Sequence, residues 1–335
     1  MRIQLITPAP LRLNNGNKIT AIRWARILRK LGHKVDVGQF YDGDRWDLLI
    51  ALHARRSHSS IEKFYQLHPK LPLIVVLTGT DLYRDIHNDR KAQRSLEVAT
   101  RLVALQTMAF AELPKRLHSK TRIIYQSAQP YRQKSSRSDK RTFQVCLIGH
   151  LREEKDPLRA AMAVRRLPSK SRIRVLHIGL ALDAHLEQRA QAEAARNPRY
   201  RWLGQLPHWK TRQVLARSDL ALITSRMEGS SNVLSEALAS SVPVVASKIP
   251  GLMGTLGKSF PGYFPVGDTQ RLAKLLLKSE TDAKFFRRLK RDCMRLSQLV
   301  EPKREVGAWR RLLGELRRES SSSDQEQTTY LRGSS

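Results

Sequence analysis

Two carboxylates flank a loop of small residues in the second half of the chain, Glu228 before the loop and Glu236 eight positions later. Between them lie the residues of the loop and of a predicted helix start, namely Gly229, Ser230, Ser231, Asn232 and Val233. Backbone N–H groups at a helix start are unsatisfied and attract phosphate, and Gly and Ser let a ligand approach closely. The arrangement suits a sugar nucleotide, with its diphosphate on the N–H groups and its hydroxyls on the carboxylates. An ordinary loop with a solvated Glu236 fits the spacing equally well.

A pair of cations follows a predicted strand at Phe143–Ile148. The loop GHLREEK begins at Gly149 and contains Arg152 and Lys155. Cations that follow a strand directly are well placed to hold a diphosphate. Surface solvation of both side chains is the alternative that the pattern leaves open.

The first half also places polar residues directly after predicted strands. They are His53, Arg55 and Arg56 after Asp47–Leu52, and Thr78, Gly79 and Thr80 after Leu73–Leu77. Ligands of parallel α/β sheets bind at the carboxyl ends of the strands, so we expect an acceptor to bind here, held by cations and strand-end N–H groups. The competing interpretation is that His53 caps its strand and that the two arginines form a solvated turn.

The elements that must position these residues are short apolar runs separated by predicted helices. This alternation occurs twice and predicts an α/β fold with parallel sheets covered on both faces. The polar segment 131–141 is the expected linker between a first domain, 1–130, and a second, 142–300. A helix over 301–318 has an apolar face suited to docking, and the polar tail 319–335 is expected to be disordered.

Composition narrows the classes of function. The net charge of +31 draws anions such as phosphorylated small molecules, acidic lipids or nucleic acid. Zinc-finger, RNP-type and clear helix-turn-helix patterns are missing, so nucleic-acid binding has no support beyond charge. We find no apolar run of about 18 residues and no signal-peptide block. The two cysteines suggest neither a disulfide framework nor a metal cluster. A cytoplasmic protein is the simplest interpretation.

The segments GHLREEK, RVLHIG, RWLGQLP and SRMEGSSNVLSEALASSVPVVAS resemble, in order and spacing, the GT-B glycosyltransferases of the large retaining family 4. The resemblance implies two Rossmann-like domains facing across a cleft, with the C-terminal helix packing back on the first domain. It assigns Arg152 and Lys155 to the donor diphosphate, Glu228 to the donor-sugar hydroxyls and Glu236 to the ribose. The other implied donor contacts are Gly16, Asn17, Gly149, Gly204, Gly229, Ser230, Ser231, Asn232 and Val233.

The first half resembles a narrower group. NNGNKITAIRWARILRKLGHKV, LLIALHARRS, VVLTGTDLYRD and RIIYQSA, with FPGYFPVGD later, are similar to bacterial selenosugar synthases of selenoneine biosynthesis. Those proteins join selenophosphate to a UDP-sugar, usually UDP-N-acetylglucosamine, and form a carbon–selenium bond. The resemblance spans residues 1 to about 315. It implies a UDP-sugar donor, a selenophosphate acceptor, no metal, no cofactor and no stable attachment to membranes or nucleic acid.

Two departures from the family 4 pattern bear on the acceptor. Gly79 stands where that family often has a histidine, and Pro250–Gly251 replaces the common Gly-Gly pair, without the acidic residue expected soon after. A hydroxyl acceptor benefits from a base, typically by about 10²–10⁴-fold. Selenophosphate is already an anionic nucleophile, so the missing histidine favours the narrower resemblance.

Two other functions stay open from the sequence. One is a family 4 glycosyltransferase that acts on a lipid or another hydroxyl acceptor at a membrane surface. The other is a non-catalytic nucleotide or nucleic-acid binder. The sequence leaves the choice between glucose and N-acetylglucosamine, the anomeric outcome and the oligomeric state undetermined.

Overall fold

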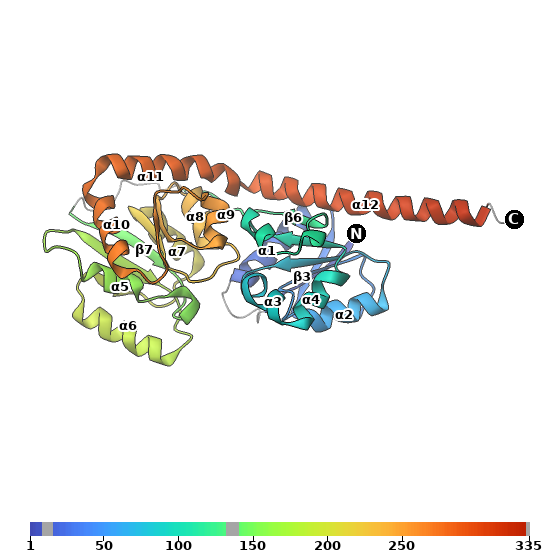
Figure 1. Ribbon diagram of the computed structural model, residues 1–335, viewed down its shortest axis with the longest axis horizontal. Coiled ribbons are helices and arrows are strands. Elements are labelled where there is room, and N and C mark those ends of the chain that lie inside the picture. The colour runs from blue at the N-terminus through green and yellow to red at the C-terminus, as the bar shows by residue number, and fades with distance from the viewer. Residues whose placement is uncertain (9–15, 132–140, 333–335) are drawn as a thin grey trace. The chain divides into compact units, whose positions relative to one another are not determined.

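The computed structural model describes residues 1–8, 16–131 and 141–332, with side chains through residue 319. The chain forms two compact units (Figure 1). Unit 1 comprises Met1–Leu105, Phe110–Tyr125 and the chain from Lys303 onward. Unit 2 comprises Gln106–Ala109 and Gln126–Pro302. Of the expected linker, residues 132–140 lie outside the described part of the chain.

Unit 1 is built on a parallel sheet with the strand order β2-β1-β3-β4-β5-β6. Its strands are β1 (Arg2–Ile6), β2 (Lys34–Gly38), β3 (Leu48–Leu52), β4 (Leu73–Leu77), β5 (Arg101–Ala104) and β6 (Thr121–Ile123). Every residue of β3 and β4 is buried, as continuous apolar runs predict for strands covered on both faces. The α-helices before the C-terminal one are α1 (Gly16–Lys30), α2 (His58–Leu67), α3 (Ile86–Asn88) and α4 (Arg90–Val98). The π-helical turn η1 (Asp81–Asp85) follows β4, and the short 3₁₀ turns are η2 (Thr107–Ala111) and η3 (Lys115–Leu117).

The C-terminal helix α12 (Pro302–Arg332) completes the core of unit 1. The indole rings of Trp24 on α1 and Trp309 on α12 lie 4.9 Å apart, edge to face. Glu305 is buried and accepts a hydrogen bond of 2.6 Å from the indole N–H of Trp24. Arg23 pairs with the same carboxylate at 3.1 Å. The expectation that this helix packs on the first domain is confirmed.

Helix α12 differs from expectation at its far end. We expect disorder from residue 319, whereas the structure continues the helix to Arg332. The tail contains Glu, Gln, Arg and Ser, and it has neither Pro nor Gly before Gly333. A sequence without a helix-breaking residue lets a docked helix continue by adding one backbone hydrogen bond per residue.

Unit 2 repeats the architecture with the parallel strand order β12-β11-β10-β7-β8-β9. Its strands are β7 (Phe143–Ile148), β8 (Ile173–Ile178), β9 (Tyr200–Trp202), β10 (Leu220–Ile223), β11 (Val244–Ser247) and β12 (Tyr263–Phe264). Its α-helices are α5 (Arg159–Val164), α6 (Ala184–Arg196), α7 (His208–Arg217), α8 (Asn232–Ala239), α9 (Pro250–Leu256), α10 (Thr269–Thr281) and α11 (Ala283–Leu296). The 3₁₀ turns η4 (Glu153–Lys155) and η5 (Ser297–Val300) complete it.

The Gly-rich segment that follows β11 contains a helix and a strand that the sequence pattern does not predict. Helix α9 begins at Pro250, and β12 adds an edge strand to the sheet. Glycines lower the helix and strand propensity of such a segment, so packing on the unit 2 core decides its structure. Within the described residues, the helices are all too short or too polar to cross a membrane.

Candidate active site

The loop that carries Glu228 leads into α8, as predicted. Ser231 is the N-cap of the helix, and its hydroxyl accepts a hydrogen bond of 3.3 Å from the backbone N–H of Leu234. Asn232 and Val233 form the first helical positions. In the loop before the N-cap, Gly229 is buried and Ser230 is half-buried. The helix start has the form expected of a phosphate-binding segment.

Lys155 and Glu228 form the central ion pair of unit 2. The Lys155 ammonium contacts one carboxylate oxygen of Glu228, and the hydroxyl of Ser225 donates to the same oxygen at 2.7 Å. Both side chains are largely buried, with 19% and 10% of their surfaces exposed. The two charges that the sequence assigns to the donor therefore come together, although they lie far apart in the chain.

Two further bonds join the loops that hold this pair. The hydroxyl of Thr224 donates to the backbone carbonyl of Lys155 at 2.8 Å. The N–H of Arg226 donates to the carbonyl of Glu154 at 2.8 Å. Arg152 is not part of this network: its nearest carboxylate is Glu154, at 3.9 Å, and 47% of its side chain is exposed. The Arg152 guanidinium is thus accessible to an anionic ligand.

Gly149 is held by a buried histidine that sequence reasoning missed. The Nε2–H of His177 on β8 donates to the Gly149 carbonyl at 2.9 Å, and Nδ1 accepts from the Tyr200 hydroxyl at 2.7 Å. Burial lowers the pKa of His177 to about 4, so the imidazole is neutral near neutral pH. At Gly179 a Cβ atom would lie 1.9 Å from the Gly149 carbonyl oxygen, so this close approach requires glycine. The segment RVLHIG contains both His177 and Gly179, but only their contacts in the folded chain show that they position Gly149.

Glu236 has a partner that the sequence did not indicate. The Nε2–H of His208, at the start of α7, donates to the Glu236 carboxylate at 2.8 Å. Gly204 lies in the segment between β9 and α7 and has a φ of +65°, a conformation that favours glycine. Its carbonyl accepts the N–H of Gly179 at 2.9 Å. Gly204 thus shapes the connection that brings His208 to Glu236.

The first-domain donor residues lie at the start of α1. Gly16 and Asn17 are its first two residues, and the Gly16 carbonyl accepts the Thr20 hydroxyl at 2.8 Å. The preceding residues 9–15, which include Asn14 and Asn15 of the predicted loop, lie outside the described part of the chain. Contact of Gly16 and Asn17 with a donor stays a prediction.

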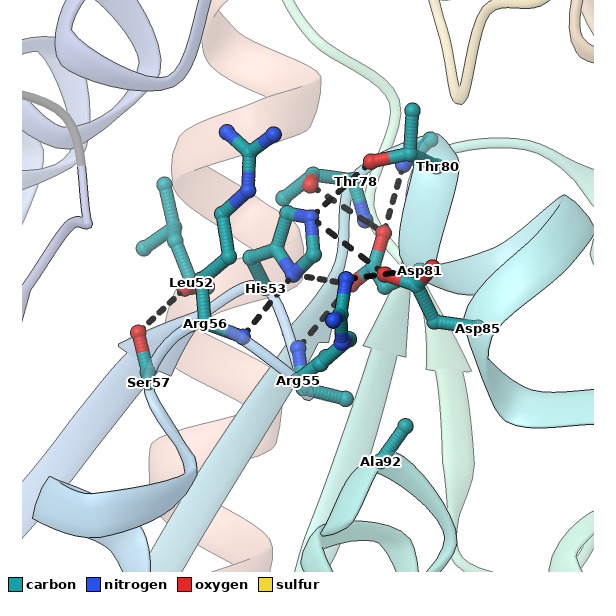
Figure 2. Close-up of polar contacts among 12 residues, drawn as sticks. Leu52, His53, Arg55, Arg56, Ser57, Thr78, Thr80, Asp81, Asp85 and Ala92 are labelled. Atoms are coloured by element: carbon teal, nitrogen blue, oxygen red, sulfur yellow. Dashed lines mark hydrogen bonds and ion pairs between the residues drawn. The ribbon is translucent and has the colours of Figure 1, made fainter. Parts of the chain in front are cut away.

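The predicted acceptor residues of unit 1 surround His53 (Figure 2). His53 has a φ of +73° and is 2% exposed. Its Nδ1 accepts the backbone N–H of Arg56 at 3.3 Å, which leaves the proton on Nε2, 2.9 Å from the Thr80 hydroxyl. Burial is the main cause that lowers the pKa of His53, against the opposing effect of the nearby Asp81. His53 therefore supports Arg56 and Thr80 from below the surface.

The structure limits one expectation about this group. We expect strand-end N–H groups at Thr78 to Thr80 to hold the acceptor, but Asp81 already uses two of them. The N–H groups of Thr78 and Gly79 donate to Asp81 Oδ1 at 2.9 and 2.7 Å. The Ala54 N–H donates to the other oxygen at 3.0 Å. Because Asp81 is fully buried, its carboxylate needs these donors.

The two arginines after β3 differ in their surroundings. Arg55 donates to Asp89 at 2.8 Å and lies 4.0 Å from Asp85. The Arg56 guanidinium extends away from Asp81 and Asp85 in Figure 2. No ion pair of Arg56 occurs among the residues that the structure describes. Of the predicted acceptor residues, Arg56 is thus the cation left available to a ligand.

The geometry of unit 2 can be compared with known families. Residues 129–293 match the family of glycosyl transferases group 1. The matched range includes Lys155, Glu228, Arg152 and Glu236. Nearly the whole of unit 2 therefore matches a group 1 glycosyltransferase domain.

Solved structures resemble nearly the whole chain. HepE of Anabaena, in complex with UDP and glucose, has 18% sequence identity and a TM-score of 0.71, over 94% of this chain and 99% of that one. Sucrose-phosphate synthase of Thermosynechococcus elongatus has 17% identity and a TM-score of 0.74, over 96% and 99%. The pneumococcal O-GlcNAc transferase GtfA, in complex with UDP and GlcNAc, has 15% identity and a TM-score of 0.63, over 88% and 60%. The fold is that of the GT-B glycosyltransferases, as predicted.

Proposed function

We propose that this chain is a glycosyltransferase that joins selenophosphate to the sugar of a UDP-sugar, with UDP-N-acetylglucosamine as the expected donor. The observation that carries the donor assignment is the Lys155–Glu228 pair inside the group 1 domain, with an accessible Arg152 in the same loop. Two of the structural relatives were solved with UDP and a sugar, which supports a UDP-sugar here.

The acceptor assignment is supported by what the His53 region offers. Its imidazole is 2% exposed and its nitrogens bond to Arg56 and Thr80, so it is poorly placed to remove a proton from a hydroxyl acceptor. Selenophosphate is already anionic and needs no such base. The cationic side chains around His53 favour an anionic acceptor over a neutral one.

In the proposed reaction the selenium lone pair forms a bond to the anomeric carbon, and the bond from that carbon to the UDP oxygen breaks. UDP leaves with the bonding electrons, and Arg152, Lys155 and the start of α8 stabilise its charge. Water then cleaves the selenium–phosphorus bond to give inorganic phosphate and the selenosugar. No residue is assigned to this second step.

The test is UDP release by the purified protein from UDP-N-acetylglucosamine, with and without selenophosphate. Reactions run with added Mg²⁺ and with EDTA, and the products are analysed by mass spectrometry. We expect release that depends on selenophosphate and a product that contains selenium. UDP-glucose in parallel reactions compares the two candidate sugars.

Three results would redirect the proposal. Equal UDP release without selenophosphate would remove the acceptor assignment. Release that requires liposomes would favour a lipid acceptor. UDP binding without any release would favour a nucleotide-binding protein that lacks catalysis.

A further inference from the structure

A cationic depression lies beside the His53 group in unit 1. It has a volume of about 600 Å³ and is lined by two segments. The turn after β3 contributes Arg55 and Arg56, and the chain around the start of α4 contributes the other lining residues, Asn88, Asp89, Arg90 and Lys91. Four of the six residues are cationic and one is acidic. None of the last four residues is among the sites that the sequence predicts.

The acidic residue does not neutralise the depression. Asp89 is the N-cap of α4, and its Oδ1 accepts the Ala92 N–H at 2.9 Å. Its Oδ2 accepts from Arg55 at 2.8 Å. These contacts, the Ala92 N–H first and Arg55 after it, lower the pKa of Asp89. The carboxylate is thus committed to the helix start and to one arginine.

Three cations remain for a ligand. Within the described part of the chain, the side chains of Arg56, Arg90 and Lys91 have no carboxylate partner within 4.0 Å. Two hydrogen bonds hold the turn that bears Arg56 (Figure 2). The imidazole of His53 accepts the Arg56 N–H, and the Ser57 hydroxyl donates to the Leu52 carbonyl at 2.7 Å. Because the turn is held in this way, less ordering is needed when an anion binds.

The chemistry of this set selects a small, multiply charged oxyanion. Arginine offers a planar fork of N–H groups that matches phosphate oxygens, and lysine adds a compact charge. The nearby N–H groups of Thr78 and Gly79 cannot contribute, since Asp81 accepts both. Side chains, rather than a backbone cradle, must therefore hold the anion.

We propose that this depression binds a tetrahedral oxyanion of the phosphate class through Arg56, Arg90 and Lys91. If the proposed function holds, this is where the phosphorus oxygens of selenophosphate bind, and Arg90 and Lys91 join the acceptor site. Anion binding itself is independent of glycosyl transfer, so the two can be tested separately.

The binding test uses inorganic phosphate and isothermal titration calorimetry at fixed ionic strength. Saturating UDP is present throughout, so that the donor site is occupied. We expect the Arg90→Ala/Lys91→Ala double variant to bind phosphate at least about tenfold more weakly than wild type. The double variant Arg287→Ala/Arg291→Ala removes the same charge from the exposed face of α11 in unit 2 and should bind normally. Equal weakening in both variants would show non-specific attraction and overturn the proposal.

Measurements of folding and of enzyme activity on the Arg90→Ala/Lys91→Ala variant distinguish the remaining outcomes. Arg90 and Lys91 are exposed and the Asp89 cap is retained, so circular dichroism and thermal unfolding of the variant should match wild type. With selenophosphate, KM for this substrate should rise about tenfold while KM for the UDP-sugar stays constant. Unchanged phosphate binding with a normal KM would overturn the inference and leave the proposed function intact. A third outcome is that only the Arg90→Ala/Lys91→Ala variant loses phosphate binding, while the wild-type protein shows no turnover that depends on selenophosphate. The binding result would then support the anion site, and the missing turnover would overturn the proposed function.

Discussion

The ammonium of Lys155 contacts the carboxylate of Glu228, and two further hydrogen bonds join the loops that carry them. The Thr224 hydroxyl donates to the Lys155 carbonyl, and the Arg226 N–H donates to the Glu154 carbonyl. A charge pair held in this way keeps its position without a ligand. The cation is therefore placed before the donor arrives, which reduces the reorganisation that the reaction requires.

Removal of the Lys155 ammonium tests this arrangement. Lys155→Ala should lower kcat for UDP release by about 10²–10³-fold, by analogy with loss of one preorganised charge-stabilising donor. The measurement is steady-state UDP release from the UDP-sugar. Lys170→Ala removes an exposed lysine from the same unit and should retain full turnover. A Lys155→Ala protein with normal kcat would remove Lys155 from the donor site.

Gly251 allows the Glu228 loop to pack on α9. A Cβ atom at Gly251 would lie 1.6 Å from the Glu228 carbonyl oxygen, and a backbone atom cannot yield cheaply. Gly251→Ala should therefore displace the loop and weaken UDP binding by about tenfold or more. Calorimetric titration with UDP gives the comparison. Gly307→Ala on α12, where a Cβ meets only a flexible side chain at 3.5 Å, is the matched control and should bind UDP like wild type.

His177 should make unit 2 sensitive to acid. Its pKa falls from 6.5 to about 4 on folding, because burial disfavours the charged ring. The unfolded chain then binds the proton more readily, so stability is complete above about pH 6.5 and is lost as the pH falls toward 4. The difference corresponds to about 3 kcal/mol.

Urea unfolding of wild type and His177→Gln at several pH values, followed by tryptophan fluorescence, measures this effect. The variant should be less stable near neutral pH and should lose less stability on acidification. His185→Gln changes an exposed histidine of the same unit and should retain the wild-type pH dependence. Parallel pH profiles for wild type and His177→Gln would contradict the assignment.

The Trp24–Trp309 contact should contribute strongly to the stability of unit 1. Trp309 is fully buried, so Trp309→Ala should destabilise the unit by about 3–5 kcal/mol. Trp209 is 63% exposed, and Trp209→Ala should change stability by less than about 0.5 kcal/mol. Thermal unfolding of both variants provides the comparison, and equal midpoints would show that α12 contributes little to the core.

The sequence predicted those features whose causes are local. Apolar runs identified the buried strands β3 and β4, and the Glu228–Glu236 spacing located the loop and helix of the candidate site. Contacts between distant segments could not be predicted in this way. The His208 bond to Glu236 and the use of the Thr78 and Gly79 N–H groups by Asp81 depend on how loops meet in three dimensions.

The cations of the depression illustrate the same limit. Arg90 and Lys91 begin α4 and are not among the site residues that the sequence predicts. Only the folded chain shows that Asp89 joins the start of α4 to Arg55 and so brings these cations beside the turn after β3. A charge count predicts attraction of anions, but it does not indicate where they bind.

The packing of α12 on α1 also sets the order in which the chain can fold during synthesis. Nearly all of unit 2 lies within Gln126–Pro302, so a ribosome delivers it as one continuous stretch. Unit 1 begins at Met1 but needs Trp309 and Leu316 to close its core. Domains generally fold as units while the chain emerges. Unit 1, whose synthesis starts before that of unit 2, is therefore completed only after unit 2 has been synthesised, and Trp24 has no partner on α12 until then.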